Sequence, residues 1–133
     1  MVNRVEKLSL LSEMIAFAKY DKDIKDIEYN FLLGVARQLE ISREDFDYLI
    51  EHPVTYTHLK SHSERIVQFH RLVLLMNIDS SSQNNGAMKL YNFGLRMGLS
   101  HESISKVLYL MESFPNKIVP PDVLIDIFKT QYN

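Results

Sequence analysis

Apolar residues recur every three or four positions along most of this chain, which is the spacing of an α-helix with one buried face. The first such segment spans about residues 2–20, with Val5 and Leu11 on the predicted apolar face. It is apolar over so much of its circumference that we expect a buried helix. Residues 57–78 form a second long segment whose C-terminal half is apolar almost all round. No stretch alternates apolar and polar residues between hairpin turns, so the pattern predicts no β-sheet.

Five shorter amphipathic segments are expected to form the remaining helices. The first of them ends near residue 39, and the other four span about residues 42–53, 86–97, 101–113 and 121–131. Ser42, followed by Glu44 and Asp45, resembles a capping box, in which the serine side chain accepts from a free amide of the first turn. Pro121 suits the first position of the last helix. The sequence therefore predicts an all-α fold of about seven helices.

The chain also contains an internal repeat with an offset of 58 positions. At this offset Ser42 falls on Ser100, and the apolar positions 46, 49 and 50 fall on 104, 107 and 108. The repeat units span about residues 5–51 and 63–112. Chance coincidence of helical periods is the alternative, and the shared caps at one offset argue against it. Since neither long helix can be buried by its own unit, we expect one domain over residues 1–133, with two pseudo-symmetric halves packed around two central buried helices.

Composition narrows the class of protein. Apolar residues make up 46% of the chain and charged residues 24%, as in an ordinary globular protein. The net charge is only −2 and no basic cluster is present, so neither nucleic acid nor an anionic membrane is an expected partner. The absence of cysteine excludes disulfides and thiol chemistry. No apolar run reaches the roughly 20 residues of a membrane span, and we expect a cytoplasmic location.

No motif for catalysis is visible in the chain. It has no Gly-x-Ser-x-Gly sequence, no glycine-rich phosphate loop and no cysteine nucleophile. We therefore expect a protein that is not an enzyme, with no catalytic residues and no organic cofactor. A small helical enzyme of unknown type is the second alternative function, because a pair of glutamates can act as acid and base without any sequence motif.

A short motif at the end of the first helix suggests a family. Asp21 follows an apolar helix ending in Ala18, with Ile24 three positions later and Glu28 seven positions later. Residues 97–100 read Met-Gly-Leu-Ser, and residues 39–42 read Leu-Glu-Ile-Ser. This arrangement resembles the TerB-like family of tellurite-resistance proteins, also found at the N-terminus of some membrane-anchored DnaJ-type proteins. The resemblance covers about residues 5–113. It implies an all-helical fold with two pseudo-symmetric halves, a role in stress response or protein association, and a pair of acidic loops that hold a metal such as calcium.

The metal site implied by the resemblance would use Asp21, Glu28 and Asp79. The chain departs from the family pattern at two points: Lys22 replaces the glycine after the first aspartate, and Gly86 stands where the second glutamate is expected. The residue spacing does not fit an EF-hand loop. A divalent-metal sensor is thus the alternative function, and a solvated helix start, with acids favoured by the helix dipole, is the structural alternative.

Two further sets of residues have the spacing of a binding site on a helix. His58 and His62 would share one helix face, but no third zinc ligand follows on that face, which favours a surface role. The last helix carries an apolar stripe that could cover its own domain or bind a protein partner, and this stripe consists of Val123, Leu124, Ile127 and Phe128. The function that the sequence favours is a non-catalytic interaction or scaffold domain with a protein partner, and a homodimer is possible.

Overall fold

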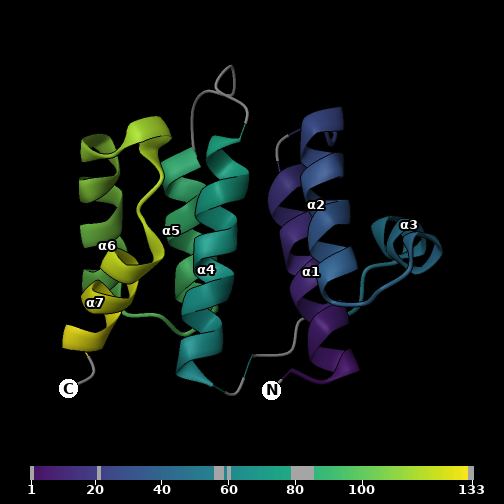
Figure 1. Cartoon of the computed structure of the whole chain (residues 1–133), viewed down its shortest axis with the longest axis horizontal. Coiled ribbons are helices and arrows are strands. Elements are labelled where there is room, and N and C mark those ends of the chain that lie inside the picture. Colours follow the sequence, from purple (N-terminus) through teal and green to yellow (C-terminus); the bar gives the residue numbers. More distant parts are fainter. Residues whose placement is uncertain (1, 21, 56–58, 60, 79–85, 132–133) are drawn as a thin grey trace. The chain divides into compact units, whose positions relative to one another are not determined.

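The computed structural model describes residues 2–20, 22–55, 59, 61–78 and 86–131 (Figure 1). These residues form seven α-helices and two short 3₁₀ helices, and none of them lies in a β-strand. The predicted all-α fold is therefore confirmed. None of the described helices is long and apolar enough to cross a membrane. The chain divides into two compact units, unit 1 up to His58 and unit 2 from Leu59.

Unit 1 contains α1 (Arg4–Lys19), α2 (Asp26–Gln38) and α3 (Arg43–Glu51). The helix α1 lies beside α2, and α3 contacts both of them (Figure 1). The buried apolar side chains of unit 1 include Leu10, Leu11, Met14, Phe17, Leu32, Ala36, Ile41, Phe46 and Leu49. Val5 was expected on the apolar face of the first helix, but 64% of it is exposed. It precedes the fully buried Met14 by nine residues, about two and a half turns at 3.6 residues per turn, and so lies on the opposite side of α1.

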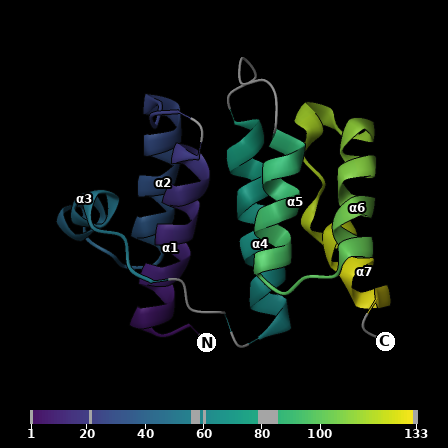
Figure 2. The ribbon, with the colours of Figure 1, turned by 180° about the vertical axis from the view of Figure 1, so that it is seen from behind.

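Unit 2 contains α4 (His62–Asn77), α5 (Gly86–Arg96), α6 (His101–Leu110) and α7 (Pro121–Gln131), with the 3₁₀ helices η1 (Met111–Ser113) and η2 (Pro115–Lys117) before α7. The helix α5 packs between α4 and α6, and α7 packs against α4 and α6 (Figure 2). The helix α4 begins later than the predicted residue 57 because Ser61 is its N-cap, with the serine Oγ accepting from the Glu64 amide at 3.3 Å.

The helix boundaries repeat at the offset that the sequence shows. Both ends of α4 lie 58 positions after the ends of α1, and α6 begins 58 positions after α3. Each first helix is capped by a side chain at the equivalent position, Asn3 in unit 1 and Ser61 in unit 2. Each third helix is capped by a serine, Ser42 or Ser100. The expected contact between the two long helices stays a prediction.

The second helix of each unit ends in the same backbone motif. Glu40 and Gly98, which are equivalent at the offset of 58, both adopt left-handed backbone angles with φ of 60° and 82°. In unit 1 the amide of Ile41 donates to the carbonyl of Ala36 at 2.8 Å, and in unit 2 Leu99 donates to Gly94 at 3.1 Å. This long bond and the left-handed residue define a Schellman C-cap, in which glycine is preferred because it has no Cβ. Glu40 therefore holds a conformation that suits glycine.

Exchanging the residue types at these two caps should change stability in opposite directions. We expect Glu40→Gly to stabilise unit 1 by about 0.5–1 kcal/mol, and Gly98→Ala to destabilise unit 2 by about 1–2 kcal/mol, because L-residues are strained in the left-handed region. Urea unfolding of both variants beside the parent chain measures the two changes. Loss of stability in Glu40→Gly would contradict this explanation of the cap.

The third helices differ in their packing although their sequences are equivalent. The helix α3 contacts both α1 and α2, and in Figure 1 it is seen nearly end-on beside them. The helix α6 instead runs alongside α5 and is covered by α7. Unit 1 ends without a counterpart of α7 among its described residues. The outward side of α3 is consequently left to solvent.

Candidate functional site

The predicted metal ligands are only partly described by the structure. Asp21 and Asp79 lie outside the described residues. Glu28 lies in the first turn of α2 and is 5% exposed. Lys22 Nζ donates to both of its carboxylate oxygens, at 2.8 and 2.9 Å, and the backbone amide of Lys25 donates to Oε1 at 3.0 Å. A lysine ammonium and a helix-start amide therefore satisfy this buried carboxylate.

The contacts of Glu28 bear on whether the acidic loop is a metal site or a helix start. The described residues contain no group of three or more His, Asp or Glu that could hold a metal ion. A cation that used Glu28 would have to displace the ammonium of Lys22, whose side chain is 27% exposed. The contacts of Glu28 are those of a helix start, where a carboxylate is favoured by free amides and by the helix dipole. Metal binding by Asp21, Glu28 and Asp79 stays a prediction.

Removing the ammonium from this pair tests what it contributes. We expect Lys22→Ala to destabilise the chain by about 1–2 kcal/mol, because it leaves the nearly buried carboxylate of Glu28 without its cation. The double variant Lys22→Ala/Glu28→Gln should recover part of this loss, since it removes the uncompensated charge. Thermal unfolding of the three chains gives the comparison. An unchanged melting temperature in Lys22→Ala would show that the ion pair contributes nothing.

Most of the apolar stripe of the last helix is buried within unit 2. Leu124 and Phe128 are fully buried and Ile127 is 5% exposed, while Val123 is partly exposed. The Phe128 ring packs edge-on against Phe69 of α4, with ring centroids 5.6 Å apart. Leu124, Ile127 and Phe128 therefore complete the core of their own unit, because α4 and α6 offer an apolar surface that α7 covers. Partner binding by the stripe of Val123, Leu124, Ile127 and Phe128 stays a prediction.

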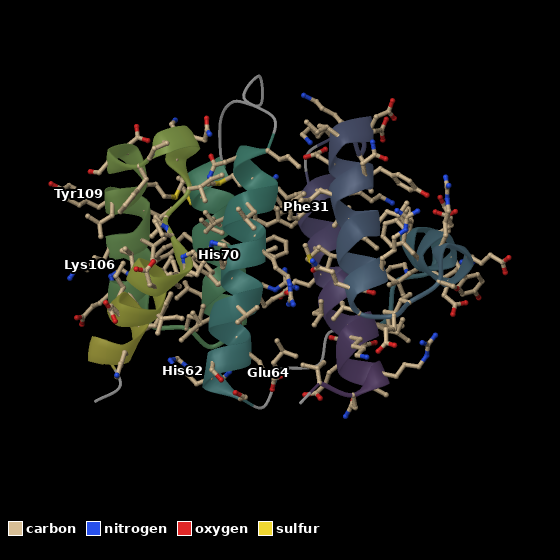
Figure 3. All side chains as sticks on the ribbon, viewed as in Figure 1. Phe31, His62, Glu64, His70, Lys106 and Tyr109 are labelled. Atoms are coloured by element: carbon tan, nitrogen blue, oxygen red, sulfur yellow. The ribbon has the colours of Figure 1, made fainter. Side chains whose placement is uncertain are left out.

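Three side chains of α4 hold the C-terminal segment in place. The His62 ring lies edge-on to Phe128 at 6.4 Å between centroids, and Asn77 donates to the carbonyl of Lys117 at 3.1 Å. His70 forms a hydrogen bond with the backbone of Val119. Figure 3 shows His70 midway along α4 and His62 at its beginning. His58, the other member of the predicted zinc pair, lies outside the described residues.

Burial shifts the titration of both histidines in the same direction. It lowers the pKa of His62 below the ordinary value of 6.5, with a smaller effect in the same direction from Arg65. Burial also lowers the pKa of His70, an effect that Arg71 adds to and the hydrogen bond to Val119 opposes. The Nε2 atom of His70 is buried and has no hydrogen-bond partner among the described residues, so protonation would place an unpaired charge there.

These shifts predict how the stability of unit 2 depends on pH. The unfolded chain binds protons on these histidines more readily than the folded chain, so stability is complete above about pH 6.5 and falls as the pH decreases through the lowered pKa values. Melting temperatures between pH 7.5 and pH 5 should therefore fall with pH, and His70→Gln should flatten the curve. A melting temperature that rises on acidification over this range would contradict the prediction.

The solvent-facing side of α3 forms the most distinctive surface of unit 1. Phe46 and Leu49 turn inward, and the opposite side consists of Glu44, Asp47, Tyr48 and Glu51, all exposed; we call this set the α3 outer face. Tyr48 is 64% exposed, and its ring stacks on His52 with centroids 4.2 Å apart and planes at 17°.

A second group of contacts fixes the edge of the α3 outer face. Tyr29 of α2 donates from its hydroxyl to Asp47, and the guanidinium of Arg43 lies 5.8 Å from the centre of the Tyr29 ring. The hydrogen bond to Asp47 raises the pKa of Tyr29. Arg4 of α1 donates to Asp45 of α3 at 2.9 Å. These contacts tie α3 to α1 and α2, so Tyr48 is presented from a braced helix.

Chemically, the α3 outer face is suited to binding cations of a protein partner. An exposed tyrosine ring attracts Lys and Arg side chains through its π face, and the neighbouring carboxylates attract the same groups. In unit 2, a hydroxyl–imidazole pair formed by Tyr91 and His101 links α5 to the start of α6.

Inspection of the sequence did not single out the α3 outer face. Its signal was present: positions 44, 48 and 51 lie opposite the predicted core positions 46 and 49 of the same helix.

The chain matches no family model, no curated protein and no solved structure.

Proposed function

We propose that the protein is a cytoplasmic, non-catalytic interaction module that binds a protein partner through the α3 outer face. The observation that carries this proposal is the exposure of Tyr48, 64% of which is open to solvent, on a helix face otherwise made of carboxylates. Tyrosine is among the residues that dominate binding energy at protein interfaces. It offers a large contact area with few rotatable bonds to immobilise.

The charge of the α3 outer face defines the class of partner. Glu44, Asp47 and Glu51 surround Tyr48 with three carboxylates, which would repel phosphate groups of nucleic acids or anionic lipids. A protein segment with exposed Lys or Arg side chains is the partner that such a face favours. Because these carboxylates are exposed, their contribution is chiefly to association rate and specificity, and the tyrosine ring supplies most of the contact area.

Affinity capture with matched baits tests this function. We expect partner recovery from cell extract with the parent chain and with Ile125→Ala, which alters an exposed apolar residue of α7 in unit 2. Recovery of the same partner should fall at least tenfold with Tyr48→Ala. Equal recovery with all three baits would contradict the assignment to the α3 outer face. Turnover of a small molecule by the purified chain would contradict the non-catalytic function.

A further inference from the structure

The two units carry opposite net charge. Residues 1–58 contain 7 Lys and Arg against 11 Asp and Glu, which gives −4, and residues 59–133 contain 8 against 6, which gives +2. The helix α3 alone contributes four carboxylates and one guanidinium to unit 1. The weak overall charge of −2 is therefore the sum of two units with opposite net charge.

The equivalent helix of unit 2 carries a different outer surface. At the offset of 58, Lys106 of α6 replaces Tyr48, and Tyr109 replaces Glu51. Both residues are exposed, Tyr109 by 81%, and we call this pair the α6 outer face. Figure 3 shows Lys106 and Tyr109 directed outward from α6, away from α4. Glu102, one turn before Lys106, is the acid nearest to the pair along the helix.

We propose that the α3 outer face of one chain binds the α6 outer face of a second copy. The proposal rests on the proposed function and identifies its partner. Each face presents one large exposed tyrosine, Tyr48 or Tyr109, and the α6 outer face places the single ammonium of Lys106 one turn from its tyrosine, opposite in sign to the carboxylates of the α3 outer face. The ammonium of Lys106 would lie beside the carboxylate of Glu51 and against the Tyr48 ring, which combines ion pairing with a cation–π contact.

The assembly that we propose is a dimer closed by two contacts between unlike faces. One contact between α3 and α6 is heterologous, since it joins different surfaces of the two copies. In a closed dimer each copy would supply both faces, so two such contacts form together. Because the ion pairs are at the surface, association should weaken as the salt concentration rises.

Sedimentation velocity with exchanged charges tests the proposal. The parent chain should form dimers whose population increases with protein concentration and falls at least severalfold between 50 mM and 500 mM sodium chloride. Glu51→Lys and Lys106→Glu should each be monomeric, because either change places like charges in both contacts of a dimer. An equimolar mixture of the two variants should dimerise again, because the mixed pair contains one native contact and one exchanged contact.

Lys129→Glu, which reverses an exposed charge on α7, is the matched control and should dimerise like the parent chain. Circular dichroism melting of each variant verifies folding, and all the substituted residues are exposed. A parent chain that is monomeric at every concentration, or a mixture that stays monomeric, overturns the self-association. Tyr48-dependent capture of a different protein by the same chain would leave the proposed function standing, so failure of the two proposals can be told apart.

Discussion

Replacing Phe128 with alanine should remove about 3–5 kcal/mol from the stability of unit 2. The ring is fully buried and lies edge-on to Phe69 at 5.6 Å, where it joins α7 to α4. Truncation of a buried aromatic loses its transfer free energy and leaves a cavity that its neighbours fill only in part. Since domains are stable by only about 5–15 kcal/mol, this change should detach α7 or unfold the unit.

Urea unfolding gives the size of this effect, and hydrogen exchange locates it. Amides of α7 should lose protection in Phe128→Ala, followed by those of α4 and α6 that α7 covers. Ile125→Ala is the control on the same helix, because this side chain is 47% exposed and should change stability by less than about 0.5 kcal/mol. If Phe128→Ala cost no more than Ile125→Ala, the packing of α7 onto its own unit would be refuted.

The position of α7 shows that the sequence could predict which side of the helix is apolar but not what covers that side. Its stripe of Val123, Leu124, Ile127 and Phe128 was correctly identified as apolar, since helical spacing alone indicates which side avoids water. Spacing does not say whose apolar surface will cover that side. The structure supplies the missing fact, because α4 and α6 leave a surface that α7 fills.

Helix boundaries were easier to predict than the orientation of helices. Ser42 and Ser100 cap their helices as the sequence pattern suggests, because a cap depends on residues within one turn of each other. The orientation of α3 depends instead on distant contacts, such as Arg4 with Asp45 and Tyr29 with Asp47. These pairs are 41 and 18 positions apart, so no local pattern reveals them.

In the acidic loop and the α3 outer face, too, local features were visible in the sequence and tertiary contacts were not. The positive charge of Lys22 beside the acidic loop was evident in the sequence, and the structure adds that its ammonium binds both oxygens of Glu28. The outward position of Tyr48 was implied by the spacing of the helix, but residue type alone does not reveal it, because an aromatic residue in an amphipathic helix is as readily a core residue. Its outward position follows from Phe46 and Leu49, which occupy the core side of α3.

A closely packed glycine in unit 2 provides the second large effect. A Cβ added at Gly94 would lie 2.7 Å from Ile104 Cδ1 and 2.9 Å from Phe69 Cε1, closer than carbon atoms can approach. Unit 1 has Ala36 at the equivalent position, and the equivalent of Phe69 is the smaller Leu11 of α1. The absence of a side chain at Gly94 thus allows α5 to approach a large aromatic ring.

Gly94→Ala should therefore destabilise unit 2 by about 1–3 kcal/mol, despite the better helix propensity of alanine, because the methyl group forces Phe69 and Ile104 apart. Gly34→Ala is the matched control: it also lies within a helix, but beyond its chain neighbours and the adjacent backbone of its own helix no atom of the described residues lies within 4 Å of its added Cβ. Here propensity acts alone, and we expect a stabilisation of about 0.5–1 kcal/mol. Urea unfolding of the two variants should give changes of opposite sign. A stabilising effect of Gly94→Ala would mean that Phe69 and Ile104 can move aside without cost, and that the contact between α4, α5 and α6 is looser than the structure indicates.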